Sequence, residues 1–307
     1  MPPFSLPGRW FRGNLHTHST LSDGGLPPER VAAAYRDAGY DFFALTDHFL
    51  ERYGWPVPDT RKFRSNSFTT LIGAELHTGK TSAGDPWHIL ATGLPLDFAP
   101  PSPGESGPEI AARAREAGAF VAIAHPAWSQ LTIEDGRALA FADAVEVYNH
   151  GCAVENDRGD GHYLLDQMLG EGHALTAIAT DDAHFRTGDF DAFGGFVMVK
   201  AQSLDPEALL AALKAGHFYA SQGPRIDFVG VEGDELRIAC SPVQSITLLG
   251  GACRTATQLG RGIVEARFTM EAVRAVARSG PGAKWFRIAV IGADGRRAWT
   301  NPVFIDR

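Results

Sequence analysis

Residues 14–24 constrain the chain most, because they place two histidines two residues apart and an aspartate five residues further on. In an extended strand, side chains at positions i and i+2 point the same way. We therefore expect His16 and His18 to direct two imidazoles at one point as a strand ends. Imidazole suits zinc, iron, manganese and copper, and the Asp23 carboxylate adds the negative charge that a divalent cation favours. Two surface histidines would show the same spacing, so the pattern alone leaves both interpretations open.

The chain later supplies more side chains of metal-binding types, most of them near the ends of predicted strands: His48, Glu75, His125, Asp182 and His184. In folds with parallel strands, the chemistry lies at the C-terminal ends of the strands. This placement favours a shared metal site over an isolated pair of surface histidines.

Length and charge limit the class of protein. The chain has 307 residues, of which 44% are hydrophobic and 21% are charged, which is ordinary for a globular protein with one large domain or one large and one small domain. Its formal net charge is −8. A chain without a basic surplus is a poor candidate for general nucleic-acid binding. Small anionic substrates remain compatible with this charge, because bound metals would supply positive charge.

The three cysteines, Cys152, Cys240 and Cys253, are too few and too scattered for a disulfide framework or a zinc ribbon. The first nine residues lack the charged-then-apolar pattern of a signal peptide, and no apolar run approaches the roughly 20 residues that a membrane span needs. We expect a soluble cytoplasmic protein with free thiols and no membrane partner.

Short apolar runs with polar tips alternate with helical patterns over the first 224 residues. Strands are predicted at 10–15, 41–46, 69–76, 87–93, 120–124, 144–148, 174–180 and 193–201. Helices are predicted after Pro27, at 109–117, 133–141 and 206–215, and within 155–172, with an irregular loop at 49–66. This alternation favours an α/β barrel or sheet with parallel strands.

The alternation of predicted strands and helices ends after Pro224. Strands are predicted at 226–230, 235–240, 245–249, 263–268, 285–291 and 302–305, with one helical stretch at 270–277. The pattern predicts two domains, a barrel over 1–224 and a small all-β, sandwich-like domain over 225–307. The second predicted domain carries no cluster of metal ligands in its sequence.

The ordered motifs resemble those of the PHP family, which is named for polymerase and histidinol phosphatase. Over roughly residues 11–220 they are His16-x-His18, Asp23, Thr46-Asp47-His48, Gly73-x-Glu75, His88, His125-Pro126 and Asp182-Ala183-His184. Further stretches resemble the branch labelled CehA/McbA-type metallohydrolases, in which a β domain follows the barrel; they lie at 191–195, 216–224 and 298–302.

The resemblance implies a distorted (β/α)7 barrel with two or three divalent metal ions. It also implies nine ligands in three groups, with Glu75 shared by the first two: His16, His18, Glu75 and Asp182; Glu75, His88 and His125; and Asp23, His48 and His184. Glu75, Asp182 and His184 are the predicted catalytic residues. His88 departs from the rest, because it begins a predicted strand instead of ending one. Family members use Asp or His where this chain has Asp23, which leaves zinc, manganese and iron open.

Several other polar residues have two interpretations each. Arg186, Asn149 and Arg12 are candidate substrate ligands, although surface arginines and a capped strand end are the more common outcomes. Asp47 either orients His48 or caps a turn, and Asp181 is expected to point away from Asp182. We expect His77 to be structural or exposed.

The favoured hypothesis is a metal-dependent phosphoesterase that acts on a small phosphomonoester or cyclic phosphodiester through a metal-activated water. The alternative is a metal-dependent hydrolase of an amide, carbamate or ester. A binding module with a degenerate site is a third hypothesis, against which the full set of ligand types argues. The sequence predicts neither the substrate, the oligomeric state nor the role of the second domain.

Overall fold

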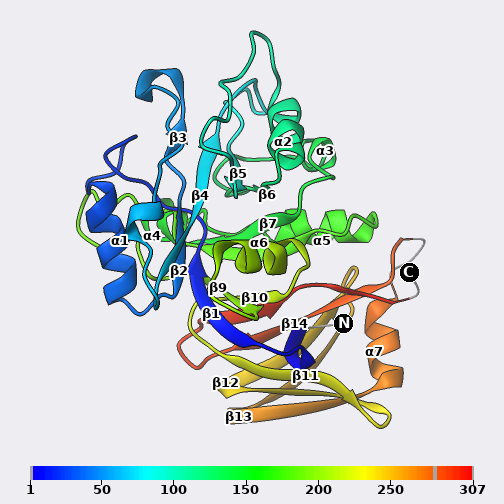
Figure 1. Ribbon diagram of the computed structural model, residues 1–307. Helices are drawn as coiled ribbons and strands as arrows, with labels where there is room; N and C mark the ends of the chain where they lie inside the picture. Colours follow the sequence, from blue (N-terminus) through cyan, green and yellow to red (C-terminus); the bar gives the residue numbers. More distant parts are fainter. Residues whose placement is uncertain (1–2, 279–281, 306–307) are drawn as a thin grey trace.

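The computed structural model of the protein describes residues 3–278 and 282–305. The outermost residues of both predicted domains, 1–2 and 306–307, lie outside the described residues. The described chain is a mixed α/β fold built on one large hydrogen-bonded sheet (Figure 1). Along its main path the strand order is β11-β12-β14-β15-β10-β9-β1-β2-β4-β5-β6-β7-β8.

The elements of the first predicted domain follow the predicted alternation. Its strands are β1 (Arg9–Asn14), β2 (Phe42–Leu45), β3 (His48–Phe49), β4 (Thr69–Leu76), β5 (Ile89–Thr92), β6 (Phe120–Ile123), β7 (Ala144–Asn149), β8 (Thr176–Thr180), β9 (Phe196–Ala201) and β10 (Phe218–Ser221). Its helices are α1 (Pro28–Asp37), α2 (Gly107–Glu116), α3 (Ile133–Ala138), α4 (His150–Asn156), α5 (His162–Gly170) and α6 (Pro206–Lys214). The predicted loop at 49–66 also contains two 3-10 helices, at Glu51–Tyr53 and Arg61–Phe63.

Local sequence chemistry accounts for these elements. The helix α2 begins with a capping box between Ser106 and Glu109, and α1 has proline in its first turn. Strands β2, β5 and β6 are apolar runs buried along their whole length, as expected for strands covered on both faces. Burial of these strands against the helices holds them in place in the sheet. The polar residues that follow the parallel strands therefore lie together at the edge where those strands end.

The strand β5 runs against its neighbours. β1, β2 and β4 are parallel, and so are β6, β7 and β8, but β5 pairs antiparallel with both β4 and β6. The start of β5 therefore lies at the same edge as the C-terminal ends of the parallel strands. This orientation explains how His88, which precedes β5, reaches the same edge as the residues that follow the other strands.

The predicted closed (β/α)7 barrel is not confirmed. Among the described residues the sheet does not close, because β8 contacts β9 and β10 without pairing with either strand. The amide of Ala177 in β8 donates to Asn301 Oδ1 (2.9 Å) in place of a strand carbonyl. In addition, β9 pairs antiparallel with β1, which breaks the all-parallel order of a regular barrel.

The C-terminal segment is rich in strands, as predicted, and it continues the same sheet. Its elements are β11 (Ile226–Glu232), β12 (Glu235–Gly250), β13 (Thr255–Thr269), α7 (Met270–Ala277), β14 (Trp285–Ile291), β15 (Arg297–Thr300) and β16 (Val303–Phe304). The strands predicted at 235–240 and 245–249 are one strand, with an irregular register around Val243. Because β15 pairs with β10, hydrogen bonding runs without interruption across residue 224. The two-domain division stays a prediction.

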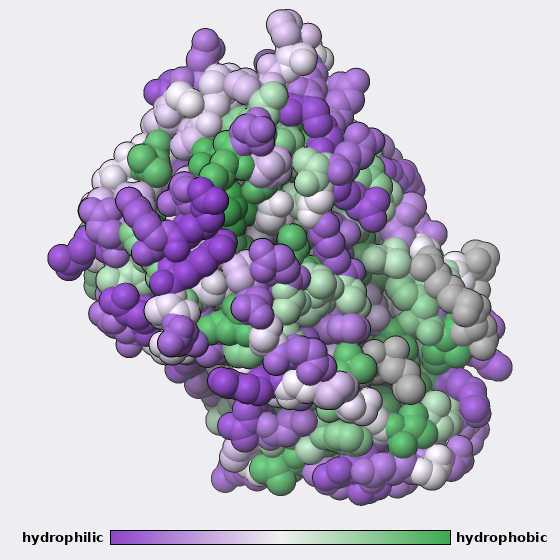
Figure 2. All heavy atoms as spheres, viewed as in Figure 1, coloured by the Kyte–Doolittle hydropathy of each residue, from purple (hydrophilic) through white to green (hydrophobic). Residues whose placement is uncertain are grey.

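The helix α7 packs on β12, β13 and β14 at one end of this segment (Figure 1). On the face shown in Figure 2, apolar residues gather over α7 and the neighbouring strands. The described part of the chain contains no helix with the length and apolar character that crossing a membrane requires.

Candidate metal centre

The nine predicted ligands come from different elements and meet at the edge where the parallel strands end. They are His16 and His18 after β1, Asp23 in the following turn, His48 at the start of β3, Glu75 in β4, His88 before β5, His125 after β6, and Asp182 and His184 after β8. Backbone hydrogen bonds bind two of these segments together. His18 N donates to Ala183 O and Asp182 N donates to His16 O, each at 2.9 Å.

Glu75 occupies the centre of the cluster and is fully buried. Its Oε1 lies 2.7 Å from His88 Nδ1 and 3.1 Å from His125 Nε2. Its Oε2 lies 2.6 Å from His48 Nδ1. The same oxygen is 3.7 Å from His16 Nε2 and 3.6 Å from His18 Nε2. The two carboxylate oxygens thus face different sets of imidazoles, as a bridging carboxylate must.

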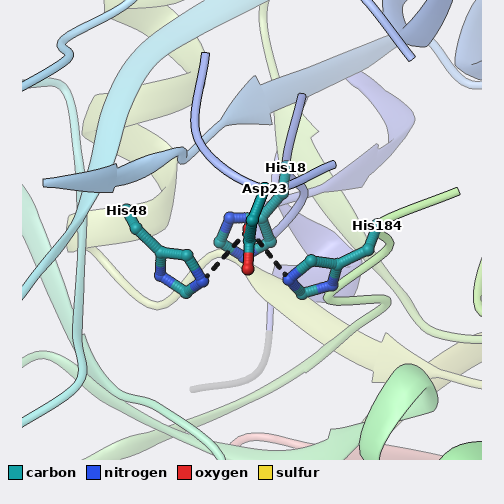
Figure 3. A group of neighbouring side chains, drawn as sticks. All are labelled: His18, Asp23, His48 and His184. Carbon is teal, nitrogen blue, oxygen red and sulfur yellow. Dashed lines mark ion pairs between the residues drawn. The ribbon is translucent and has the colours of Figure 1, made fainter. Parts of the chain in front are cut away.

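The carboxylates of Asp182 and Asp23 lie beside the remaining imidazoles of the cluster. Asp182 Oδ1 lies 3.1 Å from His16 Nε2 and 2.9 Å from His18 Nε2. Figure 3 shows Asp23 between two imidazoles, with its Oδ1 3.4 Å from both His48 Nε2 and His184 Nε2. In this group, which includes His18, one potential ligand atom from each residue lies within 4.8 Å of the others.

The residues present fit metal ions. His16 Nε2 and Glu75 Oε2 are buried and directed into the cluster. They lie at ion-pair distance from Asp182 and His48, but neither atom makes a hydrogen bond among the described residues. Leaving such groups without a hydrogen bond costs about 1–3 kcal/mol each. A divalent cation satisfies both atoms at once, and imidazole with carboxylate is a donor set that zinc, manganese and iron accept.

The charges of the cluster are strongly coupled. Burial alone would raise the pKa of Glu75, but the surrounding His48, His88 and His77 outweigh burial and hold this pKa well below its usual value. Burial opposes the His48 cation, yet Glu75 and Asp23 raise the pKa of His48 to about 10. Burial dominates at His88 and lowers its pKa to about 4. The centre therefore holds buried carboxylates that need positive charge beside them.

Two of the predicted ligands have strained backbones. His125 and Asp182 have φ angles of 24° and 55°, which residues with a Cβ rarely adopt. Such conformations persist where the surrounding structure holds them, and they cluster at functional sites. The His125 amide donates to Glu146 Oε2 (2.6 Å), which helps to hold this geometry.

Glu146 is a supporting residue that the sequence reasoning missed. It is fully buried in β7, and its Oε1 accepts from His16 Nδ1 at 2.9 Å. That bond fixes the imidazole so that Nε2 faces the cluster, as carboxylates often do for metal-binding histidines. Thr180 donates to the same oxygen. The available signal was a lone carboxylate within an apolar strand, residues 144–148.

Asn149, predicted as a possible substrate ligand, is fully buried instead. Its Nδ2 donates to Asp182 Oδ2 (3.0 Å) and Glu146 Oε2 (2.9 Å), and its Oδ1 caps α4 by accepting from Cys152 N. The residue holds Asp182 in place and does not line the cavity beside the cluster.

Asp47 and Asp181 hold backbone and hydroxyl groups, not ligand imidazoles. Asp47 accepts from Ser19 N (2.7 Å), Ser19 Oγ (2.7 Å) and Ser22 Oγ (2.6 Å), so it holds the turn that carries Asp23. Asp181 accepts from Tyr35 Oη and from two glycine amides on the far side of its strand end. Burial raises the pKa of Asp181 to about 7.

A cavity of about 480 Å³ opens beside the cluster. Three of its lining residues are Arg52, Arg186 and Trp128. Arg186 Nε donates to Asp23 O (2.7 Å), and its Nη2 pairs with the Asp23 carboxylate. Trp128 is 40% exposed, and its ring contacts those of His88 and His125.

The structure does not bring Arg12 to this cavity. Its guanidinium lies 4.1 Å from the ring centre of Tyr40 and 4.2 Å from that of Phe196, and it donates to Tyr40 Oη. The third predicted substrate residue therefore packs on aromatic rings elsewhere.

The chain is similar to known proteins in structure and not in sequence. No family model matches the sequence, and no curated protein matches it. A two-domain protein from Bacteroides vulgatus, containing a predicted PHP-like metal-dependent phosphoesterase, is similar over 98% of this chain and 97% of its own, with a TM-score of 0.53 and 18% identity. The chain therefore has the fold of that protein.

Two further solved structures are similar over 56% of this chain and 87% of theirs. One is a candidate metal-dependent phosphoesterase from Bifidobacterium adolescentis, with a TM-score of 0.42 and 17% identity. The other is an amidohydrolase from Chromobacterium violaceum with bound sulfate and no metal, with a TM-score of 0.36 and 16% identity.

Proposed function

We propose that this chain is a PHP-type metal-dependent phosphoesterase that hydrolyses a small phosphomonoester or cyclic phosphodiester. Two or three divalent ions, zinc, manganese or iron, would be held by the nine residues of the centre. The fold shared with the Bacteroides protein supports this assignment, and the motifs at 191–195 and 216–224 favour the CehA/McbA-type branch.

The observation that carries the proposal is the pairing of this cluster with arginines in one cavity. Among the described residues, no carboxylate pairs with Arg52, which leaves its guanidinium available to an anion. Arg186 is already paired with Asp23, so it places Asp23 and adds positive charge at the cavity wall. Arginine binds phosphate oxygens in a planar, bidentate geometry.

The chain's own residues divide the work of ester hydrolysis. Divalent ions, when bound, lower the pKa of water and neutralise charge on phosphoryl oxygens. Glu75 supplies one oxygen to each of two groups of imidazoles, and Arg52 would orient the phosphate toward them. Cys152 also lines the cavity, but burial together with Asp182 and Glu146 raises the pKa of its thiol, so it stays protonated and is a poor nucleophile.

The test is turnover of p-nitrophenyl phosphate and bis-p-nitrophenyl phosphate by purified protein loaded with manganese, zinc or iron. We expect activity that a chelator abolishes and added metal restores. Arg52→Ala should raise KM for the monoester about tenfold, with metal content unchanged, because a charged hydrogen bond is lost. Arg61→Ala is the matched control, since Arg61 pairs with Asp59 and does not line the cavity. Absence of bound metal and of chelator-sensitive turnover would overturn the proposal.

A hydrolase of an amide, carbamate or ester is the second candidate. The observation in its favour is the apolar part of the cavity wall, formed by Leu50, Pro86 and the exposed ring of Trp128. Divalent ions held by the same residues would supply the activated water for attack on a carbonyl carbon. Faster turnover of p-nitrophenyl acetate or a carbamate than of either phosphate ester, unaffected by Arg52→Ala, would favour this candidate.

A further inference from the structure

His77 extends the cluster beyond the nine predicted ligands. It follows β4 two residues after Glu75, and in a strand such residues face the same side. The side chain is 4% exposed and lines the cavity at the cluster. Of the two predicted alternatives for His77, structural or exposed, the structure excludes exposure.

The nitrogen of His77 that faces the cluster meets two other potential ligands. His77 Nε2 lies 2.9 Å from His48 Nδ1 and 3.5 Å from Glu75 Oε2. The ring centres of His77 and His88 are 4.2 Å apart. One ligand atom from each of His48, Glu75, His77 and His88 lies within 4.8 Å of all the others.

Hydrogen bonding alone explains this arrangement poorly. His48 Nδ1 lies 2.6 Å from Glu75 Oε2 and 2.9 Å from His77 Nε2, and a single proton on Nδ1 points to only one of them. Glu75 Oε2 is a buried oxygen without a hydrogen-bond partner among the described residues. A cation held here would be attracted to Glu75 Oε2 and to the unprotonated nitrogen of His77.

His48 has a second face. Its Nε2 lies 3.4 Å from Asp23 Oδ1, on the side of His18 and His184, whereas its Nδ1 faces Glu75 and His77. The imidazole therefore lies between two groups of potential ligands, and because a neutral ring has one unprotonated nitrogen, it can be a ligand in only one of them.

We propose that His77 is a metal ligand, which completes a cation position with Glu75 and His88, and that His48 lies between this position and the one at Asp23. The proposal rests on the metal dependence of the proposed function. With His77 the chain has ten proposed metal ligands. The cation position beside His88 then has His77 as a ligand in addition to His125.

The experiment measures zinc and manganese bound per chain by equilibrium dialysis at a series of free metal concentrations, for the wild type, His77→Ala and His77→Phe. We expect both variants to bind one ion fewer, or one ion at least about tenfold more weakly. Cobalt-loaded His77→Ala should show a changed visible absorption spectrum, and added imidazole should restore it. His173→Ala is the matched control, because His173 lies beside Glu171 outside the cluster.

The outcomes separate this proposal from the proposed function. A wild type that binds no metal ends both. A wild type that binds metal, with His77 variants of unchanged stoichiometry, affinity and cobalt spectrum, overturns the role of His77 alone. Thermal melting of the metal-free proteins identifies a misfolded variant. The His77→Phe variant controls for packing, because it keeps an aromatic ring where His77→Ala leaves a cavity.

Discussion

Glu146 determines which ring nitrogen of His16 faces the cluster. Because His16 Nδ1 donates to its carboxylate, only Nε2 of His16 is free to face the other ligands. The second oxygen of Glu146 accepts from the strained His125 backbone and from Asn149, which in turn holds Asp182. One buried side chain thus positions three predicted ligands without facing the cavity.

We predict that Glu146→Gln lowers metal affinity about 10–100-fold, because an amide accepts more weakly from His16 and leaves one of its partners unsatisfied. The activity with p-nitrophenyl phosphate should recover at high metal concentration. Isothermal titration with zinc measures the affinity, and Glu155→Gln, on the cavity wall, is the control. Equal affinities for Glu146→Gln and the wild type would contradict this role.

At the scale of single residues, the sequence indicated the candidate ligands better than the residues that support them. Ligands such as His16 and Asp182 stand at strand ends in recognisable pairs, so spacing alone singles them out. Glu146 lies inside an apolar strand, and the proposed role of His77 rests on contacts with residues that include His48, which is distant in sequence. Contacts of this kind follow from packing and leave no local pattern.

At the scale of elements, the turn at 79–86 between two predicted strands indicated that they could form a hairpin, and the antiparallel pairing of β4 with β5 confirms it. A strand's direction relative to its neighbours depends on the connection before it, and residues 77–88 form a short turn back along β4. The helix at 270–277 was predicted correctly, because its apolar residues recur at helical spacing. The helix α4 was missed, since its cap, Asn149, was assigned to the end of a strand.

The turn between His77 and His88 is attached to α3 by Asp135. This side chain caps α3 through Thr132 and also accepts from Ser82 N (2.9 Å) and Ser82 Oγ (3.0 Å). Burial alone would raise the pKa of Asp135, but the hydrogen bonds from Thr132 and Ser82 outweigh it and hold the pKa below its usual value.

We predict that Asp135→Asn lowers the free energy of unfolding by about 1–2 kcal/mol at pH 7. Because the pKa is lowered by folding, the ionised carboxylate stabilises the protein fully above the unfolded pKa of about 4. The difference between wild type and variant should shrink as the pH falls below that value. Urea unfolding from pH 3 to pH 7 measures it, and a difference that grows toward acid pH would refute the assignment.

At the scale of the whole molecule, an ion pair joins the two predicted domains. Arg287 in β14 is 3% exposed and donates to both oxygens of Asp166 in α5, at 2.9 and 2.8 Å. Removing one partner leaves the other charge buried without compensation. Because the Asp166 side chain is 36% exposed, solvent reduces the value of the pair.

We predict that Asp166→Asn destabilises the protein by about 2 kcal/mol, within a single cooperative unfolding transition. Asp97→Asn, at an exposed loop position, should change stability by less than about 0.5 kcal/mol. Urea unfolding followed by tryptophan fluorescence measures both. Two separate transitions in the wild type would show that the segments unfold independently.

We also predict that removing metal lowers Tm by about 5 °C. A ligand present at 100 times its Kd stabilises a protein by about 2.7 kcal/mol, and large domains change Tm by about 2 °C per kcal/mol. Differential scanning fluorimetry with and without chelator measures the change, which readdition of metal should reverse. An unchanged Tm would mean that bound metal does not contribute to the stability of the folded protein.

The pairing of β15 with β10 has a consequence for shortened versions of this chain. A protein ending at residue 224 would leave the hydrogen-bonding groups along one side of β10 exposed, next to buried Phe218 and Tyr219. An uncovered strand of this kind is a template for self-association. In the whole chain, β15 covers this side of β10 by pairing with it.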